Sequence, residues 1–338
     1  MRLAHVRVFQ GAQGQAGIYI WNDILLDSHG FYPEECVGAL KKIQRLGDSM
    51  PDITILSLAD TLPLSCTRSG TCCHGKSVWL NPWELARLAA AKDIAPRAFR
   101  DQYCEFGGIR LRFDGPAGWN NQAACSQYLL GSGCSVHAGR PLACRLYPLG
   151  RQGQGGRFQY IHQGSGFPCL EGCPDVVKLP HMTVAAYLAG QEAKPSETAQ
   201  DEYLELMQQL ADGAFGLLLE TGLAASGDTR TLGLWRELGS SPPGDLAKHL
   251  GPEWLDRLML PDLGDGFDSP TDFCRRHFEM LDGQTQSSFG ALGNFDAVRE
   301  ASGLLMGLAL HLGRAVGADP ADLIGHWIGT AKGLGALE

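Results

Sequence analysis

The chain has 338 residues, of which 44% are hydrophobic and 19% are charged, and its formal net charge at pH 7 is −9. This composition is typical of a globular protein and excludes an intrinsically disordered one. The negative charge argues against nucleic-acid binding, because the neutralisation of phosphates requires a basic face. The length predicts two domains or one large domain.

The chain has no sequence signal that directs it to a membrane. Its first residues carry no apolar run behind their charges, so they do not predict a signal peptide. The best candidate for a membrane span, Gly303 to Leu312, is too short to cross a bilayer and contains His311. We therefore expect a cytoplasmic protein. Because cytoplasmic thiols are kept reduced, clustered cysteines there indicate metal or redox chemistry rather than disulfides.

Residues 1–60 predict a small α/β lead-in. Two apolar segments, Val6 to Phe9 and Ile18 to Trp21, flank a Gly-rich turn as the strands of a hairpin do. Pro33 then begins a predicted helix with apolar residues along one face.

Residues 61–178 predict a loop-rich module with few strands. A helix should begin at Pro82, because Asn81 can cap it and Glu84 can complete a capping box. A second short helix is expected near Pro96, and the stretch from Gly108 to Phe113 alternates as a half-buried strand does. The remaining loops contain few apolar residues, so a metal core is expected to stabilise them.

Residues 179–338 predict a helical domain. Apolar residues recur at helical spacing between Glu202 and Leu219. The pairs Ser269-Pro270 and Asp319-Pro320 are typical of helix starts, and Gly239 to Gly244 should join two helical layers. The predicted fold is therefore α+β, with a cysteine-ligated, loop-rich module followed by an α-helical C-terminal region.

Eight of the eleven cysteines form groups inside the loop-rich region. Thiolates are soft ligands that select zinc, copper(I) or iron–sulfur clusters over magnesium or calcium. An odd total and a cytosolic setting argue against a disulfide framework. The predicted metal ligands are Cys66, Cys72, Cys73, Cys125, Cys134, Cys144, Cys169 and Cys173.

The adjacent pair Cys72-Cys73 is informative about the kind of metal centre. Neighbouring side chains in an extended chain point to opposite faces, so a mononuclear site would use both thiolates with difficulty. The pair therefore favours a cluster or two nearby metal ions. The isolated Cys36, Cys104 and Cys274 are instead expected to stand apart as small buried hydrophobes.

The cysteine-rich segment resembles the YkgJ-like cysteine-cluster family, also called the CxxCxxCC or zinc- or iron-chelating domain. The first family motif, C-x-x-C-G-x-C-C before a capped helix, corresponds to Cys66-Thr-Arg-Ser69-Gly70-Thr-Cys72-Cys73. A later motif corresponds to Cys134-Ser-Val-His-Ala-Gly-Arg140-Pro141-Leu-Ala-Cys144-Arg145-Leu-Tyr147-Pro148. The resemblance covers about residues 60–178 and implies metal chelation.

Ser69 departs from this family pattern, because it stands where the family has its second cysteine. Serine is a poor ligand for soft metals. The resemblance therefore implies that Cys169, Cys173 or a histidine replaces this ligand. His74 and His137 are the histidines closest to the two motifs.

The positive charges around Cys144 have two interpretations. Arg140 and Arg145 bracket it and are expected to bind the cofactor, by offsetting thiolate charge and donating hydrogen bonds to sulfur. Alternatively, Arg140 and the following proline only shape a turn.

Three classes of function remain open from the sequence. The protein is a zinc, iron or iron–sulfur binding module, a metal-dependent enzyme, or a helical interaction scaffold with a structural metal. A distant resemblance to flagellin lysine N-methylase implies an iron–sulfur cluster, S-adenosylmethionine and a protein or peptide substrate for the enzyme class. No P-loop and no nucleophile elbow are present, so S-adenosylmethionine would bind at the cluster.

Overall fold

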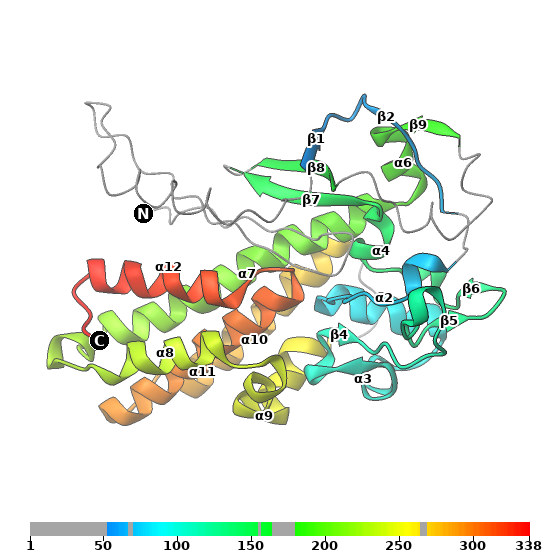
Figure 1. The fold of residues 1–338 in the computed structure, drawn as a ribbon. Helices are drawn as coiled ribbons and strands as arrows, with labels where there is room; N and C mark the ends of the chain where they lie inside the picture. The colour runs from blue at the N-terminus through cyan, green and yellow to red at the C-terminus, as the bar shows by residue number, and fades with distance from the viewer. Residues whose placement is uncertain (1–52, 67–69, 155–156, 164–179, 264–268) are drawn as a thin grey trace, which may run out of the picture.

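The computed structural model describes residues 53–66, 70–154, 157–163, 180–263 and 269–338 (Figure 1). The predicted hairpin within residues 6–21 and the predicted helix at Pro33 lie outside these ranges, as do Cys36, Cys169 and Cys173.

A three-stranded antiparallel sheet crosses the predicted boundary at residue 60. Its strands β1 (Ile53–Leu56), β8 (Arg157–Gln163) and β7 (Leu149–Gln154) lie in the order β1-β8-β7. The β7–β8 hairpin is formed by residues that were expected to be loop. Its sequence signal is weak, because β7 reads LGRQGQ and contains two glycines.

A second pairing crosses the predicted boundary at residue 178. The strand β2 (Thr61–Pro63) pairs antiparallel with β9 (His181–Thr183), which leads directly into α6 (Val184–Gly190). Cys66 follows β2 by three residues. The strand β9, at the start of the helical region, therefore pairs with the segment that leads into the first cysteine motif.

The predicted helices of the loop-rich region are confirmed. Helix α2 (Pro82–Lys92) begins with the expected capping box, in which the Asn81 side chain accepts from the Glu84 N–H at 3.0 Å. The Glu84 side chain accepts in turn from the Asn81 N–H at 3.1 Å. Helix α3 (Pro96–Tyr103) follows it.

The strand expected between Gly108 and Phe113 is much shorter than predicted. Only β4 (Arg110–Leu111) is formed, and it pairs with β3 (Cys104–Glu105). Gly107 and Gly108 have φ values of 73° and 115°, which are incompatible with an extended strand and place residues 106–108 in the 3-10 turn η2 (Phe106–Gly108). The alternating pattern therefore overestimated this strand.

The remaining elements of the cysteine-rich region are short. They are the 3-10 turns η1 (Thr71–Cys73), η3 (Trp119–Asn121) and η4 (His137–Gly139), the paired strands β5 (Tyr128–Leu129) and β6 (Gly133–Cys134), and helix α4 (Leu142–Leu146).

The C-terminal region is helical, as predicted. Its elements after α6 are α7 (Ala193–Leu219), η6 (Ala224–Ser226), α8 (Arg230–Ser240), α9 (Pro243–Met259), α10 (Pro270–Phe289), α11 (Phe295–Ala315) and α12 (Pro320–Gly333). The Ser269 and Asp319 side chains cap α10 and α12 as expected. The stretch from Gly239 to Gly244 contains the turn between α8 and α9, so it joins two helices.

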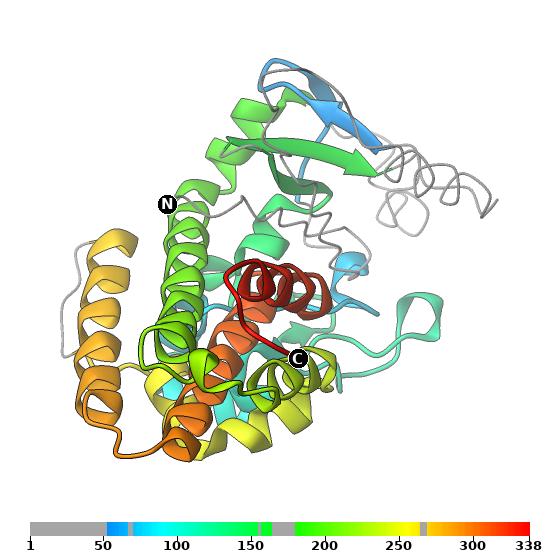
Figure 2. The same ribbon diagram turned by 90° about the vertical axis from the view of Figure 1, so that its left-hand side faces the viewer.

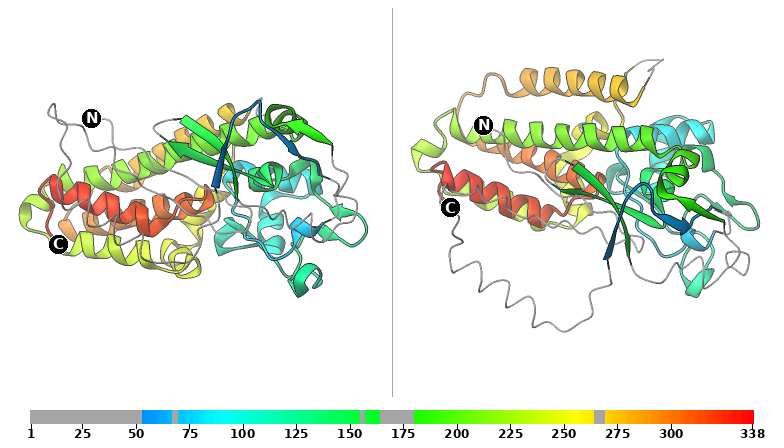
Figure 3. Two further views of the ribbon diagram at one scale, coloured as in Figure 1. Left: turned by 45° about the horizontal axis from the view of Figure 1, so that its top comes forward. Right: turned by 90° about the horizontal axis from the view of Figure 1, so that it is seen from above.

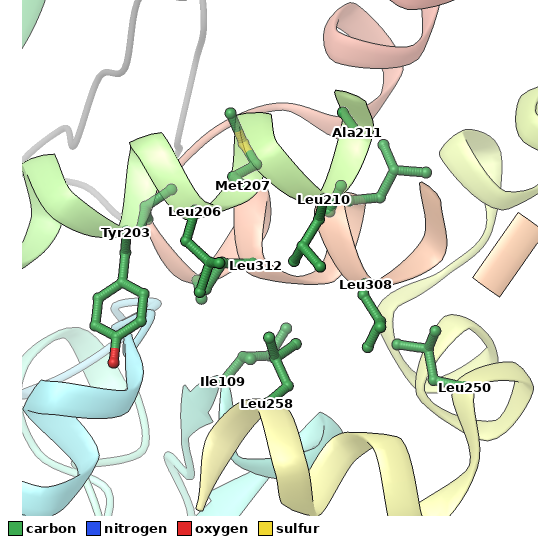
Figure 4. Packing of buried hydrophobic residues seen from close by; sticks show 14 of the residues in the cluster. Ile109, Tyr203, Leu206, Met207, Leu210, Ala211, Leu250, Leu258, Leu308 and Leu312 are labelled. Atoms are coloured by element: carbon green, nitrogen blue, oxygen red, sulfur yellow. The ribbon is translucent and has the colours of Figure 1, made fainter. Parts of the chain in front are cut away.

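The long helix α7 organises this region. Figures 2 and 3 show α10 running beside one flank of α7, and the Tyr203 hydroxyl on α7 lies 2.9 Å from Nδ1 of His277 on α10. Figure 4 shows Leu206 and Leu210 of α7 directed toward side chains of α11 and α9, among them Leu312 and Leu258. Each fully buried side chain of this kind contributes about 1.5–3 kcal/mol to stability.

The same hydrophobic core extends into the cysteine-rich region, whose elements lie at one end of the long helices (Figures 1 and 3). Trp83 of α2 packs edge-on against Phe273 of α10, with ring centroids 5.4 Å apart. Ile109, beside β4, is fully buried in this core. The helical region therefore holds the cysteine-bearing segments through apolar packing. Within the described residues, no helix is long and apolar enough to cross a membrane.

Candidate metal centre

Six cysteines from different segments are connected by a chain of electrostatic interactions, in which Cys66 reaches the others through Cys134. Burial raises the pKa of the Cys144 thiol, and Cys125, Cys134 and Cys72 raise it further. Burial likewise raises the pKa of the Cys125 thiol to about 11. Burial also raises the pKa of the Cys134 thiol, and Cys72 and Cys66 raise it further. The fold therefore gathers the described cysteines of the predicted ligand set.

The turn η1 carries the vicinal pair Cys72-Cys73. It begins at Gly70, whose φ of 79° is left-handed and whose Cα lies against the Tyr128 ring, so that a Cβ there would stand 2.2 Å from Tyr128 Cε2. The Cys73 N–H donates to the Gly70 carbonyl at 2.8 Å and closes the turn. Glycine at position 70 is thus required by both backbone conformation and space.

The expectation that the vicinal thiols diverge is wrong for this turn. A hydrogen bond joins the Cys72 and Cys73 side chains, and it is the main reason why the pKa of the Cys73 thiol lies far above its ordinary value. The physical cause is the 3-10 conformation, because opposite-facing side chains are a property of extended chain. Both thiols can therefore approach the same region.

The first cysteine motif is tied to Cys125 by backbone hydrogen bonds. The Cys125 N–H donates to the Cys73 carbonyl at 2.7 Å, and the Gly75 N–H donates to the Ala123 carbonyl at 3.1 Å. An isolated bridge between His74 and Ala124 lies between them. This short ladder places Cys125 beside the vicinal pair.

Cys125 and Cys134 occupy two equivalent turns. In each, the backbone N–H two residues further along, from Gln127 and Val136 respectively, donates to the cysteine sulfur and lowers its pKa against the effect of burial. The Ser135 N–H donates to the Gln127 carbonyl at 2.9 Å and aligns the two turns. Because an N–H dipole favours a negatively charged acceptor, both turns are suited to thiolates.

Cys144 lies in the short helix α4. The first N–H of this helix, that of Leu142, donates to Oε1 of Glu84 at 2.6 Å. Burial raises the pKa of the Glu84 carboxyl to about 7. Burial and the neighbouring cysteines raise the pKa of the Cys144 thiol, and the positive charge of Lys76 offsets a small part of this increase.

Arg140 and Arg145, the two predicted cofactor-binding arginines, differ in their contacts. Arg140 Nη1 donates to the sulfur of Cys66 at 3.6 Å, and its Nε donates to the His137 carbonyl at 3.0 Å. Arg145 donates to the backbone carbonyls of Arg140, Gln191 and Ala138 at 2.6–2.7 Å. Arg140 therefore contacts a predicted ligand, whereas these bonds of Arg145 order the surrounding loops.

The two motif histidines also differ. His137 is half-buried, and its Nε2 lies 3.9 Å from the sulfur of Cys66. His74 is buried, and its Nδ1–H donates to the Gly70 carbonyl at 2.9 Å while its ring packs edge-on against Tyr128. His74 thus supports the η1 turn, and His137 faces a thiol.

The cysteines expected to stand apart have distinct environments. Cys274 is fully buried in α10, and its thiol is hydrogen-bonded to Tyr203. Cys104 is buried at the start of β3, where burial raises its pKa to about 12 and nearby Cys125 raises it further. Cys104 therefore lies closer to the predicted ligands than its isolation in the sequence indicated.

Two residues at the site gave no usable sequence signal. The Nζ atom of Lys76 lies 3.1 Å from the centroid of the Tyr147 ring. The Gln191 side chain, at the end of α6, accepts from Arg140 Nη2 at 2.9 Å. Both contacts join segments far apart in the sequence, and neither residue has a spacing that distinguishes it.

Among the residues that the structure describes, no group of three or more His, Cys, Asp or Glu side chains stands in a ready-made metal-binding arrangement. The chemistry of the donors does fit a soft metal ion. Several thiols share one partly buried region, and backbone N–H groups and Arg140 donate to their sulfurs. Zinc and iron are metals that thiolates bind.

Comparison with known families gives the same class. Residues 65–162 match the model of the CxxCxxCC family, described as a "Putative zinc- or iron-chelating domain". The matched region contains six of the eight predicted ligands, namely Cys66, Cys72, Cys73, Cys125, Cys134 and Cys144. This confirms that residues 65–162 resemble the predicted family and form a cysteine-based domain of the zinc- or iron-chelating class. The comparisons with curated proteins and with solved structures found no match.

Proposed function

We propose that this protein binds zinc or iron through the thiolates of Cys66, Cys72, Cys73, Cys125, Cys134 and Cys144. The observation that carries the proposal is the pair of turns at Cys125 and Cys134, each with a backbone N–H donating to sulfur. Such turns are arranged for an anionic sulfur, which is the form that binds metal.

The electrostatics of the buried thiols support the same proposal. Burial and mutual interaction raise the pKa values of Cys73, Cys125 and Cys144, so these groups oppose one another's ionisation. A bound divalent cation reverses this balance, because a coordinated thiol loses its proton. A metal therefore converts an unfavourable group of buried thiols into a stabilising centre, and the helical region acts as the scaffold that holds it.

A second candidate is an enzyme that uses an iron–sulfur cluster and S-adenosylmethionine to transfer a group to a protein or peptide. One observation favours it over a single structural zinc ion. A mononuclear zinc site is saturated by four ligands, whereas six described thiols in this region are linked by electrostatic interactions. The excess of thiols is accounted for by a cluster or by two metal ions.

Anaerobic purification followed by absorption spectroscopy and elemental analysis tests both candidates. Brown protein with sulfur-to-iron charge-transfer bands supports the cluster. Colourless protein with stoichiometric zinc supports a closed zinc site. Protein that binds neither metal, before or after anaerobic reconstitution with iron and sulfide or with zinc, contradicts the proposed function.

A further inference from the structure

Cys66 and His137 face each other although 71 residues separate them in the sequence. Cys66 follows the strand β2, and His137 begins the turn η4. Both side chains are half-buried, and the distance from Cys66 Sγ to His137 Nε2 is 3.9 Å. The fold therefore brings a thiol and an imidazole nitrogen together at the edge of the cysteine cluster.

This separation is close to that of two ligands on one metal ion. A tetrahedral zinc ion holds sulfur at about 2.3 Å and nitrogen at about 2.0–2.1 Å, which places the two ligand atoms about 3.6 Å apart. An adjustment of a few tenths of an ångström brings the observed pair to that distance. The N and S atoms thus already stand almost at metal-bridged spacing.

Arg140 donates hydrogen bonds to both Cys66 and His137. Its Nη1 donates to Cys66 Sγ at 3.6 Å, and its Nε donates to the backbone carbonyl of His137 at 3.0 Å. A guanidinium beside a coordinated thiolate offsets its charge, and the bond to the His137 carbonyl fixes the turn that carries the imidazole. Cys134 also lies within electrostatic reach of Cys66. Arg140 thus contacts both halves of the Cys66–His137 pair.

The sequence explains why an additional ligand is needed here. The first motif of the matched family is C-x-x-C-x-x-C-C, as its name states. The second cysteine of that motif corresponds to Ser69 in this chain. We propose that the Nε2 atom of His137 is a metal ligand that acts together with Cys66 and compensates for the missing thiolate. This inference rests on the proposed metal-binding function and specifies the site as a mixed thiolate–imidazole centre.

X-ray absorption spectroscopy of the metal-loaded full-length chain tests the inference, with three variants beside the wild type. His137→Gln keeps a hydrogen-bond donor for the Cys66 sulfur but removes the imidazole. His137→Cys supplies a thiolate in its place. His181→Gln, at an exposed position on β9, serves as the control. Circular dichroism establishes that each variant is folded.

The wild-type spectrum should contain imidazole scattering, and His137→Cys should keep the metal with one more sulfur and one fewer nitrogen. His137→Gln should weaken metal binding more than about tenfold, because the loss of mere outer-shell partners already costs 10–100-fold. An all-sulfur wild-type spectrum, or wild-type affinity in His137→Gln, overturns the role of His137 while leaving metal binding intact. A wild-type chain that binds no zinc or iron overturns the proposed function itself and this inference with it.

Discussion

Oε1 of Glu84 accepts a hydrogen bond of 2.6 Å from the backbone N–H of Leu142, 58 residues further along the chain. Its other oxygen, Oε2, accepts from the Asn81 N–H at 3.1 Å and caps α2. One fully buried carboxyl group therefore satisfies the N-termini of two helices, α2 and the α4 helix that carries Cys144. The capping box predicted from the sequence is also the anchor of a predicted metal ligand.

Glu84→Gln should destabilise the protein by about 1–3 kcal/mol. A glutamine amide presents N–H donors to one of the two backbone N–H groups, and a buried N–H then has no acceptor. Denaturant unfolding measures the change. The matched control is Glu253→Gln on α9, whose carboxylate is exposed and pairs with Arg257 one turn further along the helix. A smaller effect at position 84 than at position 253 would contradict this role of Glu84.

The same carboxyl group predicts a pH dependence. Burial raises the pKa of Glu84 from its ordinary value of 4.5 to about 7. Between these values the folded state keeps a proton that the unfolded chain has lost, so the free energy of unfolding falls as pH rises. The contribution is fully present below 4.5 and is lost above about 7, a change on the order of 3 kcal/mol at 1.36 kcal/mol per pKa unit.

Glu84→Gln isolates this effect, because the amide does not titrate and the other groups are common to both proteins. The stability of the wild type relative to the variant should therefore decline between pH 4.5 and pH 7 in a denaturant titration. A difference that stays constant over this window would show that the Glu84 carboxyl does not retain its proton in the folded state.

Gly70→Ala should disrupt the turn that presents Cys72 and Cys73. An alanine at position 70 would have to adopt the left-handed φ of 79°, and its Cβ would stand 2.2 Å from the Tyr128 ring. Gly222→Ala is a matched control, because Gly222 has a φ of 85° and nothing within 4 Å of the position of a Cβ. The control should lose about 1–2 kcal/mol from backbone strain alone. Position 70 should lose more, and metal affinity should fall with it; equal losses and unchanged affinity would contradict the account of this turn.

The sequence predicted the helical starts well because their signals are local. Asn81, Ser269 and Asp319 each act on backbone N–H groups two or three residues away, so their side chains and the following prolines were sufficient. The sheet β1-β8-β7 could not be predicted in the same way. Its strands are brought together by tertiary pairing, and the glycines of β7 give no strand signal.

The candidate site likewise combines features that the sequence predicts with features that depend on tertiary contacts. The grouping of the cysteines was enough to predict a zinc- or iron-chelating segment, which the family match over residues 65–162 supports, whereas the ligand set itself stays a prediction. The separate roles of Arg140 and Arg145 depend on which acceptor each guanidinium reaches, and no sequence pattern encodes that. The proximity of Cys104 to Cys125 was also missed, because it arises from the packing of β3 rather than from cysteine spacing.

Arg140→Gln should reduce metal affinity by about 10–100-fold while leaving the fold intact. The guanidinium donates to the sulfur of Cys66, and the loss of such an outer-shell partner typically has an effect of this size. Arg145→Gln is the contrasting variant. It removes bonds to backbone carbonyls and should lower stability more than Arg140→Gln does. Competition with a metal chelator gives the affinities, and a weaker effect on affinity at position 140 than at position 145 would contradict the assignment.

Metal content in two cysteine variants tests the central claim most directly. Cys144 lies among the other thiols, whereas Cys274 is fully buried in α10 beside Tyr203. Metal–thiolate bonding contributes on the order of 10–16 kcal/mol in small zinc sites, so the loss of a ligand should release metal and loosen the loops around it. Elemental analysis and limited proteolysis should show that Cys144→Ser loses zinc or iron and is cleaved within residues 61–178, while Cys274→Ser keeps both metal and resistance. A Cys144→Ser protein with full metal content and wild-type resistance to protease would contradict the claim that these cysteines form a metal centre.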